Sequence, residues 1–160
     1  MAGTYRFLII DGYAKQSRDD FDAAGMKHAG ILYANMLHAY LPGAQYDLLY
    51  TSDPGTVIPD VKAIGAYAGV LWPGCNLTVY QTDDPRVKTM IDLCDRVFEA
   101  GVPQFGTCWG IQLPVFVAGG EVKANPKGRE MGIGRKICLT AEGKKHPMMK
   151  GKPGVYDHFV

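Results

Sequence analysis

The 160-residue sequence lacks the features that mark several specialised classes of protein. No apolar run reaches the roughly 18 residues that a membrane span needs, and no charged-then-apolar signal sequence opens the chain. Like charges form no long block, and the formal net charge is only +1. One small basic cluster, Lys144–Lys145 with Lys150 and Lys152, is interpreted as a solvated loop. We therefore expect neither a membrane nor a nucleic acid as the main partner.

Cysteine is scarce, and its spacing excludes two common kinds of site. No two of the four cysteines form a C-x-x-C pair, which argues against a zinc site and against thioredoxin-like chemistry. We expect no metal, no cofactor, free thiols and a cytoplasmic, reducing location. Cys94 lies on the apolar stripe of a predicted helix and Cys138 at the end of a predicted strand, so both are expected to be buried and inert.

Length and periodicity predict a single α/β domain over residues 1–160. The apolar runs typical of strands are 5–10, 45–50, 68–72 and 102–105, with shorter ones at 121–124 and 134–139. The expected helices span about 20–40, 61–67, 85–100 and 109–118. This alternation predicts right-handed βαβ units, which build a three-layer, open, mostly parallel sheet with helices on both faces.

Asp84 and Pro85 are typical of the start of the third expected helix and Gly101 of its end. The apolar faces expected on the first and third helices are Ala29, Leu32, Tyr33, Met36, Leu37 and Tyr40, and Val87, Met90, Ile91, Cys94, Val97 and Phe98.

Cys108 is the strongest candidate for chemistry. It stands in a G-x-C-x-G pattern between Gly106 and Gly110, after a short apolar strand and before a helix. A turn that holds a nucleophile at its tip needs residues without a Cβ on both sides, because strand and helix approach closely there. A helix N-terminus also favours the thiolate. The pattern therefore predicts a cysteine nucleophile.

A second loop, Trp72-Pro73-Gly74-Cys75-Asn76, also leaves the carboxyl end of a predicted strand. Ligands bind at such ends in parallel sheets. The N–H groups of the Gly74/Cys75 turn, with that of Trp109, are predicted to stabilise an oxyanion. Gln112 lies one helical turn after Cys108, where it either binds a polar substrate or holds the loop.

The sequence identifies no histidine as the general base. A cysteine nucleophile usually needs a histidine that is itself oriented by a carboxylate or amide. The four candidates are His28, His38, His146 and His158, and none occurs as His-x-Glu or His-x-Asp. The first two lie on an early predicted helix and are expected at the surface.

With the elbow and the glycine loop in place, the chain resembles the class I glutamine amidotransferase family, and is similar to the amidotransferase domain of GMP synthase. The segments that carry the resemblance are 106–113 with Gly119-Gly120, 72–80, Arg129-Glu130-Met131-Gly132 and His146-Pro147-Met148. The resemblance implies a flavodoxin-like fold and glutamine as substrate. It also implies that Cys108 releases ammonia through a glutamyl thioester, for a synthetase partner that this chain does not contain.

Two departures from the family pattern shape the expectation. Cys75 and Asn76 stand where the family commonly has a small residue and Pro in the oxyanion loop. The family's His-x-Glu base lies roughly 80 residues past the cysteine, so we expect a domain incomplete at its C-terminus and little glutaminase activity from this chain alone. The alternatives are a non-catalytic or redox-sensing member of the fold, or another cysteine hydrolase on the same elbow.

Overall fold

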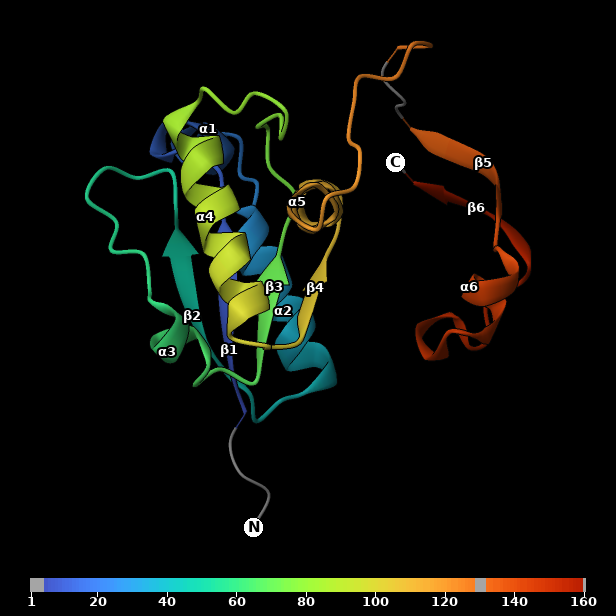
Figure 1. Cartoon of the computed structure of the whole chain (residues 1–160), viewed down its shortest axis with the longest axis horizontal. Helices are drawn as coiled ribbons and strands as arrows, with labels where there is room; N and C mark the ends of the chain where they lie inside the picture. The colour runs from blue at the N-terminus through green and yellow to red at the C-terminus, as the bar shows by residue number, and fades with distance from the viewer. Residues whose placement is uncertain (1–4, 129–131, 160) are drawn as a thin grey trace. The chain divides into compact units, whose positions relative to one another are not determined.

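The computed structural model describes residues 5–128 and 132–159 (Figure 1). The chain divides into two compact units, residues 1–122 and 123–160, and each is described here by itself. The expectation of one domain over 1–160 stays a prediction. The first unit contains β1 (Arg6–Asp11), α1 (Lys15–Ala23), α2 (Ala29–Tyr40), β2 (Gln45–Tyr50), α3 (Val61–Ile64), β3 (Gly69–Trp72), α4 (Pro85–Glu99), β4 (Gln104–Gly106) and α5 (Trp109–Val117).

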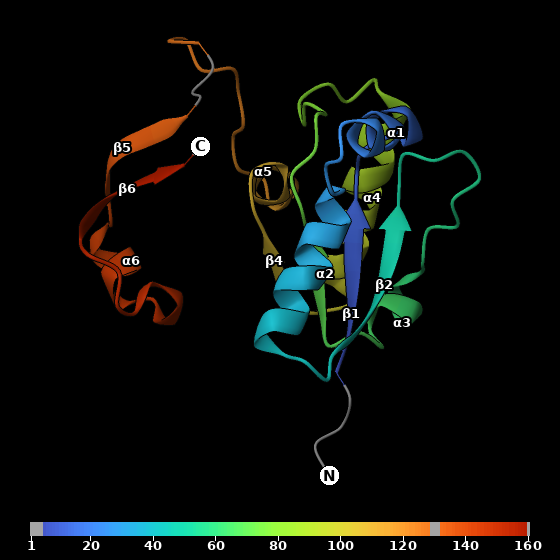
Figure 2. The same ribbon diagram turned by 180° about the vertical axis from the view of Figure 1, so that it is seen from behind.

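The first unit is the predicted three-layer α/β arrangement. Its four strands lie in the order β2-β1-β3-β4, and every neighbouring pair is parallel. Helices α3, α4 and α5 pack on one face of the sheet, and α2 lies on the other (Figures 1 and 2). The central strands β1 and β3 are largely buried and apolar, because helices cover both of their faces, as in other parallel sheets. All strand ends that carry the predicted site therefore meet at one edge.

The larger core lies under α4 and α5. Its buried side chains come from β1, β3, three helices and the loop between β3 and α4: Leu8, Ile10, Ile64, Val70, Trp72, Val79, Val87, Met90, Leu93, Cys94, Val97, Trp109 and Leu113. The stripe predicted on α4 is confirmed at Val87, Met90, Cys94 and Val97, whereas Phe98 is 46% exposed. Asp84 caps α4 by accepting a hydrogen bond from the N–H of Arg86, with Pro85 at the first helical position.

The long helix predicted over 20–40 is wrong, because the chain forms two helices there. α1 ends at Ala23, and Gly25 at φ +67° turns the chain before α2 begins at Ala29. A residue at positive φ cannot continue a right-handed helix, and glycine adopts that conformation without a Cβ penalty. The apolar period itself begins at Ala29, the first residue of α2, and the error lies in extending the helix back to residue 20.

Asp11 provides the long-range contact that positions the start of α2. It is the last residue of β1 and is fully buried, and its carboxylate accepts hydrogen bonds from the N–H groups of Gly30 and Tyr13 at 2.8 and 3.0 Å. Gly30 has no room for a side chain, since a Cβ there would lie 2.8 Å from Cδ2 of Leu48 on β2. The first turn of α2 is thus seated directly on the sheet.

The apolar face predicted for α2 is only partly buried. Ala34 is buried, and Tyr33 and Leu37 pack against the smaller core with Ile9 and Leu71. Leu32 and Tyr40, expected on the same face, are 54% and 86% exposed. The strand predicted at 121–124 is also absent, because these residues form no ladder in the described part of the chain.

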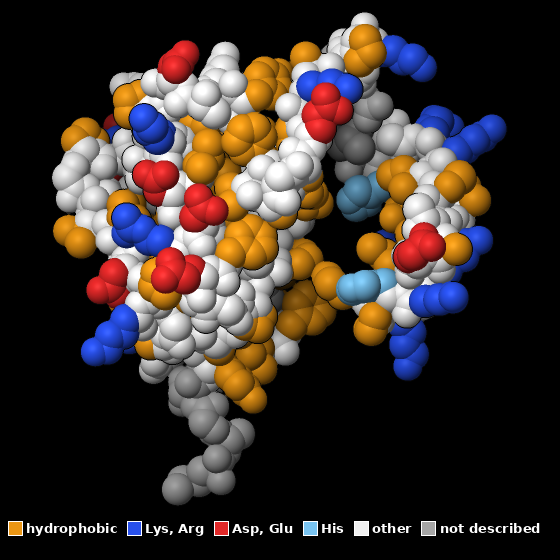
Figure 3. Space-filling view, viewed as in Figure 1, with side chains coloured by type: hydrophobic (Ala, Val, Ile, Leu, Met, Phe, Trp, Pro, Cys, Tyr) orange, Lys and Arg blue, Asp and Glu red, His pale blue; other side chains and the backbone are white. Residues whose placement is uncertain are grey.

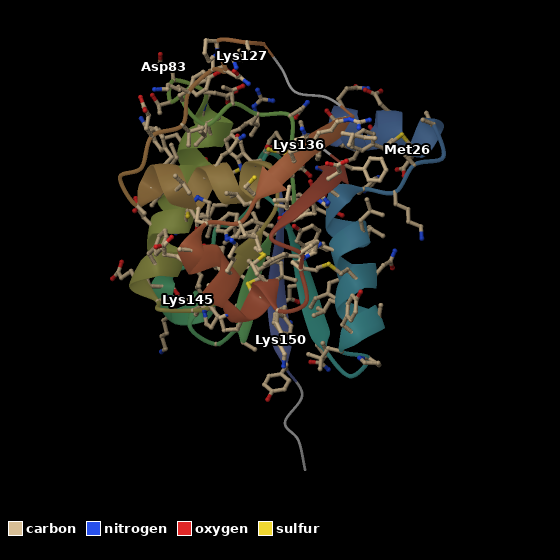
Figure 4. All side chains as sticks on the ribbon, turned by 90° about the vertical axis from the view of Figure 1, so that its right-hand side faces the viewer. Met26, Asp83, Lys127, Lys136, Lys145 and Lys150 are labelled. Atoms are coloured by element: carbon tan, nitrogen blue, oxygen red, sulfur yellow. The ribbon has the colours of Figure 1, made fainter. Side chains whose placement is uncertain are left out.

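The second unit is a small two-stranded antiparallel arrangement. It contains β5 (Ile133–Cys138), α6 (Ala141–Lys145), the 3-10 turn Pro147–Met149 and β6 (Val155–Phe159), and β5 pairs with β6. Its cations project into solvent, and Figures 3 and 4 show them on its surface. The described part of this unit holds eight of them, Lys123, Lys127, Arg135, Lys136, Lys144, Lys145, Lys150 and Lys152, against Glu142 and Asp157. The predicted solvated basic cluster is confirmed.

Residues 129–131, which carry part of the family resemblance, lie outside the described residues. Within residues 5–128 and 132–159, no helix is both long and apolar enough to cross a bilayer.

Replacing Asp11 by Ala should lower the free energy of unfolding by about 2 kcal/mol or more, because two buried N–H groups lose a charged acceptor. Urea unfolding monitored by circular dichroism measures the loss of unfolding free energy. Asp19→Ala is the matched control, since Asp19 makes an exposed ion pair with Lys15, and such pairs contribute about 0–1 kcal/mol. Equal small losses in the two variants would contradict the structural role given to Asp11.

Candidate active site

The nucleophile candidate lies at the tip of a strained turn between β4 and α5. Cys108 has φ 55° and ψ −118°, and it is one of two non-glycine residues at positive φ in the described part of the chain. Such a conformation costs about 1–3 kcal/mol and persists only where the surrounding structure enforces it. The Cys108 side chain is exposed, and its residue is the N-cap of α5. The thiol is thus held in solvent at a helix N-terminus.

The two glycines that flank Cys108 are required by backbone contacts. A Cβ built on Gly110 would lie 2.0 Å from the carbonyl oxygen of Trp72, and one on Gly106 would lie 2.1 Å from the carbonyl oxygen of Gly110. Backbone atoms cannot move aside as a flexible side chain can. The G-x-C-x-G pattern therefore reflects close contact of β4 and β3 with the first turn of α5.

The Gly74 loop reaches the elbow, as predicted. A Cβ built on Gly74 would lie 3.2 Å from Cβ and 3.4 Å from Sγ of Cys108. β3 and β4 are adjacent parallel strands, and Trp72 pairs with Gly106 at their ends. The two loops that follow these strands are therefore side by side, with the backbone of Gly74 next to the thiol.

The neighbouring thiol of Cys75 is directed into the protein. Its Sγ lies 3.1 Å from where a Cβ on Gly12 would be, beside the Met90 side chain. Burial raises its pKa to about 12, and the nearby charges of Cys108 and Asp11 add to the rise. Cys75 is therefore a neutral thiol at physiological pH, and its candidate contribution to the site is its backbone.

Trp109 and Gln112 occupy the first turn of α5. The backbone N–H of Trp109 belongs to the N-terminal group that has no acceptor within the helix. Its indole ring is buried, with Nε1 unpaired among the described residues. Gln112 donates its backbone N–H to the carbonyl of Cys108 at 3.3 Å, and its side chain is exposed. Both residues lie on the first turn of α5, as the sequence predicted.

Thr107 is tied to three elements around the elbow. Its N–H donates to the carbonyl of Trp72 at 3.1 Å, and its carbonyl accepts from the N–H of Gly110 at 2.9 Å. Its hydroxyl is 2.7 Å from the hydroxyl of Tyr33 on α2. Sequence reasoning placed Tyr33 on a core face and missed this contact, which only the folding of α2 against β4 creates.

None of the four histidines forms a described hydrogen bond to Cys108. Nε2 of His28 lies 2.9 Å from Oδ1 of Asp22, and Nε2 of His38 lies 3.1 Å from the carbonyl of Ala44. His146 accepts the N–H of Met148 through Nδ1 at 3.2 Å. His158 lies on β6 opposite Gly134. The described contacts therefore assign no general base.

The two remaining cysteines differ from each other. Cys94 is fully buried, as expected, and burial raises its pKa to about 12. The expected burial of Cys138 is wrong: Cys138 is exposed on β5, where only one partner strand and no helix layer covers it. Among the described residues, no three of His, Cys, Asp and Glu gather in a way that would hold a metal ion.

Replacing Gly110 by Ala should destabilise the protein by about 3 kcal/mol or more, because the new methyl group meets backbone rather than a movable side chain. Urea unfolding measures the change. Gly43→Ala is the control, since nothing lies within 4 Å of a Cβ at Gly43 and its φ is not positive. A Gly110→Ala protein as stable as Gly43→Ala would show that β3 and α5 do not approach as described.

Thiol labelling of the native protein at pH 8 should separate the cysteines into two classes. Cys108 and Cys138 should react with iodoacetamide, whereas Cys75 and Cys94 should stay protonated and protected, given pKa values of about 12. Peptide mass spectrometry identifies the modified sites, and labelling in denaturant should recover all four. Rapid native labelling of Cys94 would contradict its place in the core.

Comparisons with known proteins agree with this geometry, although no family model matches the chain. It is 29% identical over 157 residues to the gamma-glutamyl-L-1-hydroxyisopropylamide hydrolase of a Pseudomonas species, across 96% of this chain and 52% of that protein. It is 32% identical over 142 residues to the GMP synthase [glutamine-hydrolyzing] of Latilactobacillus sakei, across 88% of this chain and 25% of that protein.

A solved structure shares the fold. The crystal structure of a glutamine amidotransferase from Thermotoga maritima matches with a TM-score of 0.63 at 18% identity, across 98% of this chain and 60% of that one. The chain thus spans about half the length of the Pseudomonas relative and a quarter of the GMP synthase.

Proposed function

We propose that this chain, which belongs to the class I glutamine amidotransferase family, supplies the cysteine nucleophile for hydrolysis of a γ-glutamyl amide. The observation that carries the proposal is the elbow: Cys108 at φ 55°, exposed at the N-terminus of α5, with Gly74 against its side chain. Glutamine is the substrate we propose first. Its side-chain amide is the simplest γ-glutamyl amide, with ammonia as the leaving group.

In the proposed reaction, Sγ of Cys108 attacks the amide carbonyl carbon and forms a tetrahedral intermediate. The N–H of Trp109 and those of the Gly74/Cys75 turn donate hydrogen bonds to its oxyanion. Collapse breaks the C–N bond, the nitrogen leaves as ammonia after taking up a proton, and a γ-glutamyl thioester remains on Cys108. Water then attacks the thioester to release glutamate and restore the thiol.

Substrate selection would come from groups around the thiol. Gln112 is one turn along α5 with an exposed side chain, and an amide there can hydrogen-bond the polar end of glutamine. The Pseudomonas relative is named for hydrolysis of a γ-glutamyl amide whose amine is larger than ammonia. The shared part of the two substrates is the γ-glutamyl group. We therefore propose that the site recognises this acyl group and that glutamine and small γ-glutamyl amides both fit.

The ammonia would pass to a synthetase partner, a proposal supported by the GMP synthases among the relatives. The four free cysteines support a cytoplasmic location.

A diazo-ketone analogue of glutamine should attach covalently to the protein in a one-to-one ratio, at Cys108. Intact mass and peptide mapping measure the adduct, and Cys108→Ala should abolish it. Excess glutamine should slow the labelling at least about tenfold, while asparagine, one methylene shorter, should protect weakly because the carbonyl no longer reaches the thiol. Testing a small γ-glutamyl amide as protectant measures the breadth of the substrate class.

Cys138 is the internal control in the same experiment, since it is also exposed but lacks the elbow. Equal labelling of Cys108 and Cys138, without protection by glutamine, would rule out the enzymatic proposal. Reversible oxidation of Cys108 by peroxide in such a protein would then favour the redox-sensing alternative.

A further inference from the structure

The geometry points to Tyr33 as a positioning residue for Cys108, acting through the hydroxyl of Thr107. This inference rests on the proposed nucleophilic role of Cys108. Tyr33 lies on α2, on the opposite face of the sheet from α4 and α5, and no sequence motif connects it to the elbow. Its hydroxyl is 2.7 Å from Oγ1 of Thr107, the residue that immediately precedes the nucleophile.

The elbow needs such a contact because its tip is strained. A non-glycine residue at φ 55° returns to ordinary backbone angles unless its neighbours are fixed. Two backbone hydrogen bonds hold Thr107 to β3 and to the first turn of α5. The Tyr33 hydroxyl adds the side-chain restraint and joins α2 to the same residue. Thr107 is then fixed from three directions immediately before Cys108.

The Tyr33 ring is itself well placed to act as an anchor. It packs against the smaller core and lies 6.4 Å, centroid to centroid, from the ring of Phe105 on β4. Asp11 seats the first turn of the same helix on the sheet through Gly30. Tyr33 therefore approaches the elbow from a helix whose position is already determined, so its hydroxyl has little freedom to follow a moving loop.

Tyr33 acts as a neutral hydroxyl rather than as a base. Burial raises its pKa above the ordinary value of 10, and the nearby charge of Cys108 adds to the rise. Cys75, another titratable group beside Cys108, has a pKa of about 12. Neither Tyr33 nor Cys75 changes charge between pH 6 and 9, so neither contributes its own titration to the Cys108 profile in that range.

The test is the rate of Cys108 alkylation by iodoacetamide between pH 6 and 9, with Cys138 in the same molecule as the reference thiol. Tyr33→Phe keeps the ring and removes the hydroxyl. At pH 7 the ratio of the Cys108 alkylation rate to the Cys138 alkylation rate should fall about two- to fivefold. Loss of one favourable charge–dipole interaction at a helix N-terminus lowers the thiolate population by about that factor.

Three further variants separate positioning from general destabilisation. Tyr67→Phe is the matched control, because it removes a hydroxyl bonded at 2.7 Å to Asp47, far along the chain from the elbow. It should leave the Cys108 profile unchanged. Thr107→Val should give the same Cys108 profile as Tyr33→Phe. The double variant Tyr33→Phe/Thr107→Val should show no further change, because both substitutions remove the same hydrogen bond. Thr107→Ser keeps the hydroxyl and should retain the wild-type profile.

An unchanged Cys108 profile in Tyr33→Phe would overturn the inference, and so would equal falls in Tyr33→Phe and Tyr67→Phe. Iodoacetamide does not require recognition of glutamine. Failure of this inference is therefore distinguishable from failure of the proposed function, which the glutamine analogue tests in the wild-type protein.

Discussion

The close approach of β3 to the first turn of α5 is the constraint on which the rest of the site depends. At Gly110 the helix backbone lies so near the carbonyl of Trp72 that a single methyl group would meet it at 2.0 Å. That contact requires glycine at 110, and a second backbone contact, with the carbonyl of Gly110, requires glycine at 106. The adjacent strands β3 and β4 end together, which brings the loop after β3 against the thiol. The oxyanion donors that we propose and the nucleophile thus depend on the same close approach of backbones.

The strain at Cys108 and the ties on Thr107 belong to the same arrangement. Cys108, at positive φ, is exposed at the N-terminus of α5, where partial positive charge favours the anionic form of a thiol. This conformation costs free energy, and the surrounding hydrogen bonds offset it. The buried carboxylate of Asp11 contributes at a distance, by seating the helix that carries Tyr33. The chemistry proposed for the site therefore depends on residues from both faces of the sheet.

Several parts of the fold follow from local rules, and these were predicted well. The four predicted runs match β1 to β4 within a few residues, and the central strands β1 and β3 are largely apolar because helices cover both of their faces. The two ends of α4 were also predicted correctly. Asp84 caps the helix, Pro85 is its first residue and Gly101 follows its end at positive φ, and each of these effects involves only neighbouring backbone. The errors fall where distant contacts decide. The break between α1 and α2, the exposure of Leu32 and Tyr40, and the exposure of Cys138 all depend on which surfaces meet in space.

By itself, the sequence determined the layered parallel fold and the identity of the elbow, because glycine spacing and apolar periodicity express local steric requirements. It also pointed to Gly74, Cys75, Trp109 and Gln112, which follow strand ends that a parallel sheet must bring to one edge. Only the tertiary structure decided that the Cys75 thiol faces inward and is neutral, and that Asp11 seats α2. The approach of Tyr33 to Thr107 was decided in the same way. These facts join residues more than 15 positions apart through packing between layers, and no local pattern in the chain encodes such contacts.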